Sequence, residues 1–327
     1  MGQLLLRKYF CMLSNKLGLA PRALSSFSKR LVVIDYHYFT SKDLIYPDLE
    51  VSYESLEAQL EIISRNCRLR PPVETLEDLF SGRMKSEEQS LVITIDDADK
   101  SLLDALNFFH EFKIPFVLFA PVGLCLSENE LDGVRSRCLS MYKYLSLPDL
   151  PEPYSLLTNA DKYFDFIINS SFIDLEKFYK LIRPIQRERS IILERNLLTI
   201  QQLKDIIETN KIIISSHTMS HSILSELPSD WMKWEISRSL EIIRQIGGDT
   251  RLFAYPYGYK KSYDKNVKNT LENAGVKYAF MTTSSLTKQN SDHLAIGRAS
   301  MLNYKESSFV LGTVSGAFRI WDKLLLR

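Results

Sequence analysis

The amino-acid sequence predicts an α/β fold in which parallel strands alternate with helices, as in a (β/α) barrel. Short, continuously apolar segments recur along the chain, and helix-like stretches separate most of them. Continuous apolar character is typical of strands that are buried on both faces, as in a parallel sheet or barrel. With 327 residues, the chain is long enough to bury a large core in one domain or two.

Seven segments are expected to form the strands because each is apolar along most of its length. In chain order they are LVVIDYHYF (31–39), SLVITIDDA (90–98), PFVLFAP (115–121), KIIISSH (211–217), LFAYPYG (252–258), KYAFMTT (277–283) and HLAIGR (293–298). No internal repeat is visible in the sequence.

Helix signals lie between these strands. In YESLEAQLEIISRN (53–66), apolar residues recur at helical spacing and mark one face. Thr199 and Gln202 form a capping box at the start of another helix. The segment WMKWEISRSLEIIRQI ends at the glycine pair 247–248, and NVKNTLENAG ends at Gly275, as helices commonly end at glycine.

The alternation is interrupted between the third and fourth expected strands. We expect residues 31–327 to form the barrel domain, with a mostly helical insertion at about 125–197 that contains LPDLPEPYS and YFDFIINSSFIDLEKFYKLI. In barrel enzymes, insertions after strands build the walls of the substrate site. A packing element or an oligomer contact is an equally open interpretation, and the oligomeric state is not predicted.

Composition excludes several classes of protein. The net charge is +1, with 45% hydrophobic and 25% charged residues, so a basic nucleic-acid surface and an acidic tail are both excluded. The four cysteines form no CxxC pair, which argues against a zinc ribbon or a disulfide framework. Buried thiols in a reducing compartment are the favoured interpretation.

Residues 1–30 are expected to form a helical, peripheral segment. Arg7, Lys8, Asn15 and Lys16 interrupt its apolar residues, so we expect neither a signal peptide nor a membrane span. The segment could rest on a membrane surface or pack on the domain as a helix, and the second alternative is favoured. The expected location is the cytoplasm, or the periphery of the inner membrane face.

Two adjacent carboxylates, Asp96 and Asp97, end the second expected strand. Neighbouring strand residues point to opposite faces, so these two side chains cannot do the same work if the strand continues through them. A polar strand end that enters a turn or a helix cap is the alternative, and it is the interpretation we keep for Asp99.

Two histidines, His217 and His221, follow the fourth expected strand in SSHTMSH. Histidines four residues apart can converge on one metal ion. Together with a strand that ends in aspartates, they predict a site of two histidines and one carboxylate. Three protein ligands leave a coordination position for water, which is typical of catalytic metals.

A third segment, RLFAYPYG (251–258), bends sharply at a strand end through Pro256 and Gly258. Such a bend leaves backbone amide groups that can point into a site, although an aromatic-rich turn is the alternative.

The three segments, in this order, resemble the motifs of polysaccharide deacetylases with the NodB homology domain (carbohydrate esterase family four). TIDDAD (94–99) is similar to the family's TFDDG, HTMSH (217–221) to H[ST]xxH, and FAYPYG (253–258) to a common form of the third motif. The resemblance covers roughly residues 31 to 300, apart from the insertion.

The resemblance implies a distorted (β/α) barrel with a divalent metal at the carboxyl-terminal mouth of the strands. Asp97, His217 and His221 would be the metal ligands, and Zn²⁺ is favoured, although other divalent ions fit the same set. Asp96 would be the general base, and the backbone N–H of Tyr257 would donate to the oxyanion. The side chains expected to bind substrate are those of Tyr255, Pro256 and Tyr257.

The sequence departs from the family pattern at three positions. Many members have an arginine where this chain has Ala254, so we expect Arg298 to hold the base aspartate. For Arg251 we favour a surface ion pair.

The family's C-terminal histidine is missing, but His37 in YHYF is similar to the early histidine of the poly-N-acetylglucosamine deacetylase branch. We therefore expect His37 to be the general acid, with a buried structural histidine as the alternative. Ala98 replaces a glycine, and we expect a slightly different turn there.

The resemblance implies a metal-dependent hydrolase that removes an N-acetyl or similar small acyl group from an amino sugar in a polysaccharide, oligosaccharide or glycolipid precursor. A deformylase, or another hydrolase of a small amide, is an alternative within the same chemistry. A catalytically silent sugar-binding protein with the same fold is the alternative from another class.

Overall fold

The computed structural model describes most of the region in which the sequence predicts the barrel. The described residues are 30–84, 89–127, 130–142, 145–147, 150–188, 197–210, 212–283 and 286–316. The segment expected at residues 1–30 therefore lies outside the described part of the chain, apart from Arg30, which begins the first strand. None of the described helices is both long and apolar enough to span a lipid bilayer.

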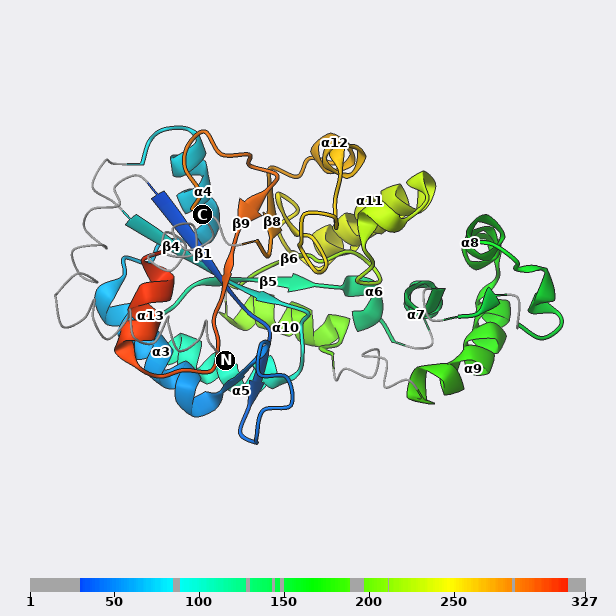
Figure 1. Cartoon of the computed structure of the whole chain (residues 1–327), viewed down its shortest axis with the longest axis horizontal. Coiled ribbons are helices and arrows are strands. Elements are labelled where there is room, and N and C mark those ends of the chain that lie inside the picture. The colour runs from blue at the N-terminus through cyan, green and yellow to red at the C-terminus, as the bar shows by residue number, and fades with distance from the viewer. Residues whose placement is uncertain are drawn as a thin grey trace, which may run out of the picture. The chain divides into compact units, whose positions relative to one another are not determined.

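Eight strands form one sheet, in the order β10–β1–β4–β5–β6–β7–β8–β9 (Figure 1). The strands are β1 (Arg30–Tyr36), β4 (Gln89–Asp96), β5 (Phe116–Ala120), β6 (Ile213–Ser216), β7 (Leu252–Ala254), β8 (Tyr278–Met281), β9 (Ile296–Gly297) and β10 (Ala299–Ser300). The pairs β1–β4, β1–β10, β6–β7 and β8–β9 are parallel. The predicted α/β fold of the barrel kind is confirmed, with eight strands in place of about seven.

The two strands at the ends of this order come from one short stretch of chain. β9 pairs with β8, β10 pairs with β1, and only Arg298 separates β9 from β10. This stretch, which we call the closing segment (296–300), thus joins the last strand of the order to the first and nearly closes the barrel. The sequence predicted one strand at 293–298, but the chain changes its pairing partner at Arg298.

The first expected strand, 31–39, is also divided in two. β1 ends at Tyr36, and after His37 the chain continues as β2 (Tyr38–Thr40). β2 pairs in parallel with β3 (Glu50–Ser52) in a separate two-stranded sheet. His37 therefore follows the carboxyl end of β1, which is where barrel enzymes carry their functional residues.

The chain divides into two compact units. The first consists of Met1–Leu118, Gly258–Lys260 and Lys277–Arg327, and the second of Phe119–Tyr257 and Lys261–Val276. In the described part of the first unit, the helices are α3 (Tyr53–Asn66), α4 (Pro72–Phe80), α5 (Ser101–Glu111) and α13 (Ser307–Val314). The predicted apolar face of α3 is confirmed, since Leu56, Leu60 and Ile63 are fully buried. The helix starts where the Ser52 hydroxyl accepts a hydrogen bond from Ser55 N–H at 3.2 Å.

The second unit contains most of the remaining helices. They are α6 (Val122–Cys125), α7 (Leu131–Met141), α8 (Ala160–Asn169), α9 (Phe172–Glu188), α10 (Ile200–Asn210), α11 (Ser229–Gln245) and α12 (Lys265–Asn273). The capping box predicted before α10 is confirmed: Thr199 N–H donates to Gln202 Oε1 at 2.9 Å, and Gln202 N–H donates to Thr199 Oγ1 at 3.2 Å. As predicted, α11 ends just before Gly247, whose φ of 85° is left-handed.

Helices α7, α8 and α9 account for most of the described part of the insertion (Figure 1). They enclose an aromatic core that includes Tyr163, Phe164 and Phe178 and extends to Trp231 of α11. The buried Tyr163 hydroxyl donates to the carbonyl oxygen of Cys138 at 2.6 Å. Burial also raises the pKa of the Cys138 thiol, so this cysteine packs as a neutral group. The described part of the insertion is mostly helical, as predicted, and it packs against α11.

Candidate active site

The pair Asp96–Asp97 lies where β4 turns into the loop before α5. Asp96 is the last residue of β4, whereas Asp97 and Ala98 have left-handed φ values of 71° and 55°. Because the backbone turns at Asp97, the two carboxylates leave the strand end in different directions. Asp99 accepts a hydrogen bond from Ser101 N–H at 2.9 Å and so stabilises the start of α5, as its turn-or-cap interpretation predicted.

Ala98 adopts a backbone conformation that usually favours glycine. Alanine was expected to impose a different turn because it lacks the conformational freedom of glycine. Ala98 nevertheless adopts the left-handed conformation itself and is fully buried. A single non-glycine residue can occupy this region at a cost of about 1–2 kcal/mol when its surroundings hold it there.

Arg298 reaches Asp96 from the closing segment. Its Nη1 lies 2.7 Å from Asp96 Oδ1 and its Nη2 lies 2.6 Å from Oδ2, while Nη1 also donates to Thr94 Oγ1 at 3.1 Å. The side chain is fully buried. Burial by itself lowers the pKa of Arg298, but the charges of Asp96, Asp35 and Asp97 raise it above its usual value overall, so the guanidinium stays charged.

His37 lies near the same aspartate, in the gap between β1 and β2. Its Nε2 is 4.0 Å from Asp96 Oδ2, and its Nδ1 is 3.7 Å from Asp35 Oδ2. The imidazole is mostly buried, with 14% of its side chain exposed. Asp35 is fully buried, and its Oδ2 also accepts a hydrogen bond from Ser300 Oγ at 3.0 Å.

Two of these neighbours were not identified from the sequence. Asp35 stands two residues before His37, so both side chains share one face of the chain as it leaves β1, and an aspartate inside an apolar strand was the available signal. Tyr38 was missed as well. Its buried hydroxyl donates to Asp97 Oδ2, which orients the carboxylate.

The two histidines of HTMSH follow the carboxyl end of β6. His217 Nδ1 lies 2.8 Å from the carbonyl oxygen of Ala254. A carbonyl only accepts hydrogen bonds, so Nδ1 carries the proton and Nε2 keeps the lone pair that a metal ion requires. The His217 and His221 rings are 4.8 Å apart between centroids, at an interplanar angle of 68°.

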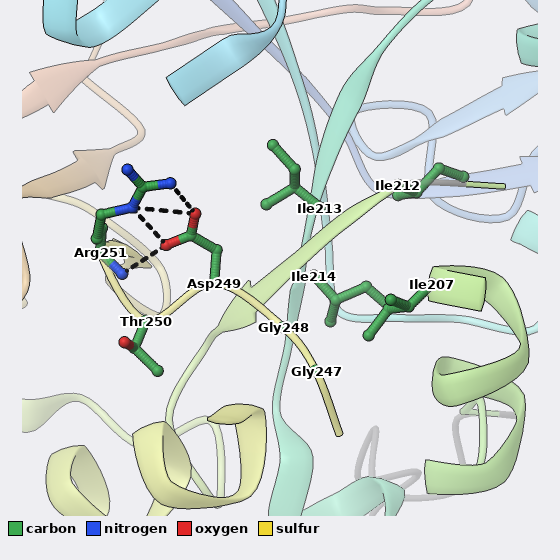
Figure 2. Close-up of a pocket in the computed structure, with 9 residues that line it drawn as sticks. All are labelled: Ile207, Ile212, Ile213, Ile214, Gly247, Gly248, Asp249, Thr250 and Arg251. Atoms are coloured by element: carbon green, nitrogen blue, oxygen red, sulfur yellow. Dashed lines mark hydrogen bonds and ion pairs between the residues drawn. The ribbon is translucent and has the colours of Figure 1, made fainter. Parts of the chain in front are cut away.

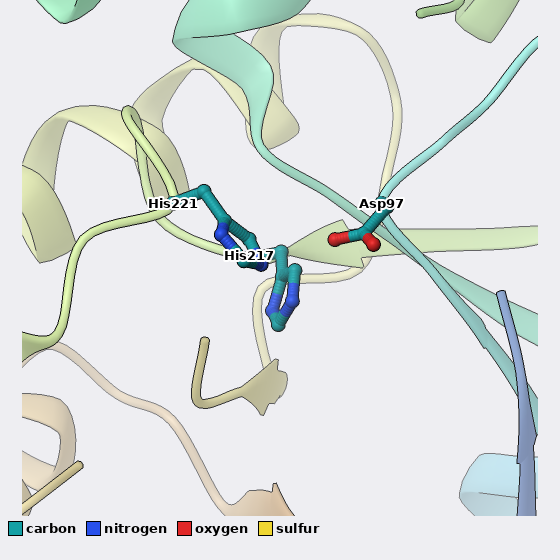
Figure 3. Close-up of side chains that lie close together, drawn as sticks. All are labelled: Asp97, His217 and His221. Atoms are coloured by element: carbon teal, nitrogen blue, oxygen red, sulfur yellow. The ribbon is translucent and has the colours of Figure 1, made fainter. Parts of the chain in front are cut away.

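Asp97, His217 and His221 form a group that could hold a metal ion. Each offers one ligand atom, and within the described part of the chain these atoms all lie within 4.8 Å of one another (Figure 3). Two imidazole nitrogens and one carboxylate oxygen suit Zn²⁺ and leave a coordination position for water. The proton on His217 Nδ1 and the Tyr38 bond to Asp97 fit the same role, because metal ligands are commonly oriented by such partners.

The third motif begins in β7 and contains two tyrosines whose side chains differ in exposure. Tyr255 is fully buried and its ring stacks on Tyr263, with centroids 4.3 Å apart. We expected Tyr255 to bind substrate, but its ring would have to move out of the core before a substrate could touch it. Pro256 is buried as well.

Tyr257 has a left-handed φ of 61°, is 42% exposed, and lies against His221 at 4.9 Å between ring centroids. Gly258 is required after it, because a Cβ there would lie 2.5 Å from Thr282 N.

A hollow of about 420 Å³ lies elsewhere in the second unit (Figure 2). Its walls include Ile207, Ile213 and Gly248, which lie near the amino-terminal ends of β6 and β7. Arg251 pairs there with Asp249, with Nη2 2.7 Å from Oδ2, in line with the ion pair favoured for it. His217 and Pro256 follow the opposite, carboxyl-terminal ends of these strands, so the hollow is separate from the candidate site.

Comparisons with known proteins give a family match and several structures with a similar fold. The family model described as "Polysaccharide deacetylase" matches residues 167–279, a stretch that contains both HTMSH and FAYPYG. The deacetylase PplD of Streptococcus pyogenes, solved in complex with acetate, is 14% identical at a TM-score of 0.59, covering 88% of this chain and 99% of PplD. The chain shares its fold with this deacetylase.

Two further structures support the same conclusion. IcaB from Ammonifex degensii is 17% identical at a TM-score of 0.57, covering 88% of this chain and 97% of IcaB. BC0361, a polysaccharide deacetylase from Bacillus cereus, is 16% identical at a TM-score of 0.57, covering 88% of this chain and 70% of BC0361. No curated protein matches the sequence.

Proposed function

We propose that this chain is a metal-dependent N-deacetylase that removes an acetyl or similar small acyl group from an amino sugar in a glycan or glycolipid precursor. The observation that carries the proposal is the ligand group Asp97, His217 and His221, together with a neighbouring aspartate, Asp96, that a buried arginine holds with two hydrogen bonds. A structural metal site would not need that second, separately held carboxylate. The match of residues 167–279 to the deacetylase family model supports the reaction class.

The protein residues would divide the work of hydrolysis. A divalent metal on Asp97, His217 and His221 would supply a water of lowered pKa and would polarise the amide carbonyl. Asp96 accepts the proton of the attacking water through a carboxylate oxygen. Arg298 fixes the plane of that carboxylate, since its two N–H groups engage both oxygens.

The remaining steps fall to Tyr257 and His37. The backbone N–H of Tyr257 donates to the carbonyl oxygen as negative charge develops on it. His37 gives its proton to the amine nitrogen as the C–N bond breaks, which yields a carboxylate and a free amino sugar. Asp35 Oδ2 lies 3.7 Å from His37 Nδ1 and so places a carboxylate beside this imidazole.

The exposed ring of Tyr257 would contact the sugar. It lies beside His221 and offers a flat apolar face, on which the C–H groups of a pyranose ring can pack. Because only a short acyl group must reach the metal, formyl and acetyl amides are both candidate substrates.

Release of acetate from N-acetylated oligosaccharides by the purified, metal-loaded chain would test the proposal. We expect release that stops after chelation and returns with Zn²⁺. Asp96→Asn should lower kcat by roughly 10²–10⁴-fold, whereas Asp230→Asn, an exposed control on α11, should not change it. The enzyme proposal fails if the metal-loaded protein hydrolyses no amide of a formyl, acetyl and aryl series. It also fails if Asp96→Asn hydrolyses these amides at the wild-type rate.

A further inference from the structure

The loop that carries the two histidines has a backbone that its own sequence does not favour. Thr218 and His221 have left-handed φ values of 69° and 58°, and neither is a glycine. β-branched residues such as threonine are rare in this region. The loop therefore depends on contacts from its surroundings to hold both imidazoles in place.

One side of the loop is held by backbone groups of α6. Val122 N–H donates to the carbonyl of Thr218 at 3.2 Å, and Leu124 N–H donates to that of Met219 at 3.2 Å. Between them, Gly123 lies so close that a Cβ would be 2.7 Å from the Met219 carbonyl oxygen. This side of the loop is therefore fixed by close backbone packing.

The other side of the loop meets a single carboxylate, that of Glu235 on α11. Its Oε2 accepts hydrogen bonds from the N–H groups of Met219 at 2.8 Å and Ser220 at 3.0 Å, and its Oε1 accepts from the Ser220 hydroxyl. The side chain is only 1% exposed. Burial raises the pKa of Glu235, while the bonds from Ser220, Met219 and Thr218 act in the opposite direction.

These contacts lie between the two metal-ligating residues. Met219 and Ser220 are two of the three residues that separate His217 from His221. Their N–H groups point to the same oxygen, so any shift of this oxygen moves the connection between the two imidazoles. A buried glutamate is rare unless such partners satisfy it.

We propose that Glu235 is a positioning residue for the metal centre: its carboxylate holds the HTMSH loop in the conformation that brings His217 and His221 onto one ion. This inference rests on the metal site of the proposed function. Partners that orient metal ligands commonly contribute 10–100-fold to metal affinity. Glu235 is not one of the three candidate ligands but bonds to the loop between two of them, so its effect should appear first in metal binding.

Two substitutions at Glu235 separate the effect of its negative charge from the effect of its hydrogen-bond acceptors. In Glu235→Gln, the amide oxygen can still accept from both N–H groups, and the amide nitrogen can donate to the Ser220 hydroxyl oxygen. In Glu235→Ala, both buried N–H groups lose their acceptor. We expect metal affinity within about tenfold of wild type for Glu235→Gln and a loss of about 10–100-fold for Glu235→Ala.

The experiment measures Zn²⁺ and Co²⁺ affinity of the metal-stripped protein by competition with a chromophoric chelator. The d–d absorption spectrum of bound Co²⁺ reports the ligand geometry and should change in Glu235→Ala. Two controls lie on the same helix. Glu241→Ala removes an exposed carboxylate that pairs with Arg238, and Ile236→Val weakens the buried face. Both should keep the wild-type affinity and spectrum, even if Ile236→Val lowers the Tm.

Unchanged affinity and an unchanged Co²⁺ spectrum in folded Glu235→Ala would overturn the inference, whatever happens to its Tm. If that variant does not fold, Glu235→Asp carries the test, because the shorter side chain cannot reach both N–H groups. The Glu235→Asp variant should then bind metal more weakly than Glu235→Gln, and the reverse order would refute the role. A wild-type chain that binds neither ion would overturn the metal centre itself, whereas wild-type binding with no effect of Glu235 would overturn only this inference.

Discussion

Arg298 holds Asp96 across 202 residues of sequence, with Nη1 2.7 Å from Oδ1 and Nη2 2.6 Å from Oδ2. Both side chains are buried. Many deacetylases of the resembled family have an arginine inside the third motif, where this chain has Ala254. In this chain the contact with the aspartate comes from the closing segment.

Replacing Arg298 by lysine should abolish most activity although the positive charge remains. A lysine ammonium cannot engage both oxygens of Asp96 at once, so the carboxylate loses its orientation. Removing the charge, in Arg298→Ala, should also lower the free energy of unfolding by about 3–5 kcal/mol, because Asp96 stays buried without its partner. Urea unfolding and acetate release measure the two effects. Arg251→Ala, which breaks the Asp249 pair away from the candidate site, is the control, and equal losses in both alanine variants would contradict the prediction.

His37→Ala should lower kcat by roughly 10²–10⁴-fold while the protein keeps its metal. The reason is that an alkylamine needs a proton to leave, whereas an aniline with electron-withdrawing groups does not. The rate of His37→Ala on an N-acetylated nitroaniline should therefore fall much less, relative to wild type, than its rate on an N-acetylated sugar. Metal content by mass spectrometry and rates on both substrates test this, and equal losses on the two would show that His37 is not the acid.

Asp35→Asn should lower kcat by about tenfold or more through its effect on His37. Asp35 contacts His37 but not the ligand group, so metal affinity should stay unchanged. The double variant with His37→Ala should be no slower than His37→Ala alone, because the two residues act as one unit. Additive losses would mean that Asp35 works by some route other than His37.

Tyr38→Phe removes the hydroxyl that donates to Asp97 Oδ2. The carboxylate then loses an orienting partner, and metal affinity should fall by about 10-fold or more. Tyr36→Phe is a matched control, since the Tyr36 hydroxyl donates to Gln59 at 3.0 Å instead. Competition titration with Zn²⁺ should distinguish the two variants. Equal Zn²⁺ affinities of Tyr38→Phe and Tyr36→Phe would exclude the proposed role of Tyr38.

The Cys67 thiol should react slowly at neutral pH. Burial raises its pKa to about 12, above the ordinary value near 9, so the reactive thiolate is scarce. Folding then favours the protonated thiol: this contribution to stability is complete below pH 9 and is lost as pH rises toward 12. Alkylation of Cys67, followed by peptide mass spectrometry, should accelerate with pH up to about pH 12. A plateau near pH 9 would contradict the raised pKa.

Local patterns predicted the regular elements well. The capping box of Thr199 and Gln202 and the buried face of α3 depend on neighbours in sequence, and both are present. The division of the last strand at Arg298 was not predictable, because it depends on pairing with β8 and β1 rather than on local propensity.

The candidate site was predictable only in part, for similar reasons. The motifs indicated Asp97, His217 and His221, but Tyr38, Asp35 and Glu235 contact the site through tertiary packing that no short motif encodes. The tyrosines of FAYPYG show a further limit. The left-handed turn at Tyr257 decides that this ring is exposed while Tyr255 is buried, and non-glycine residues rarely reveal such a turn in sequence.

The closing segment links the orientation of Asp96 to the closure of the barrel. Arg298 sits between the strands that pair with β8 and with β1, and it is also the residue that orients Asp96. Bringing together residues so distant in sequence costs loop-closure entropy before the contact stabilises the chain, so we expect this contact to form late. A refolding chain should therefore regain helix content and metal binding before it hydrolyses any amide. Enzymatic activity in this protein would thus report that its barrel has closed.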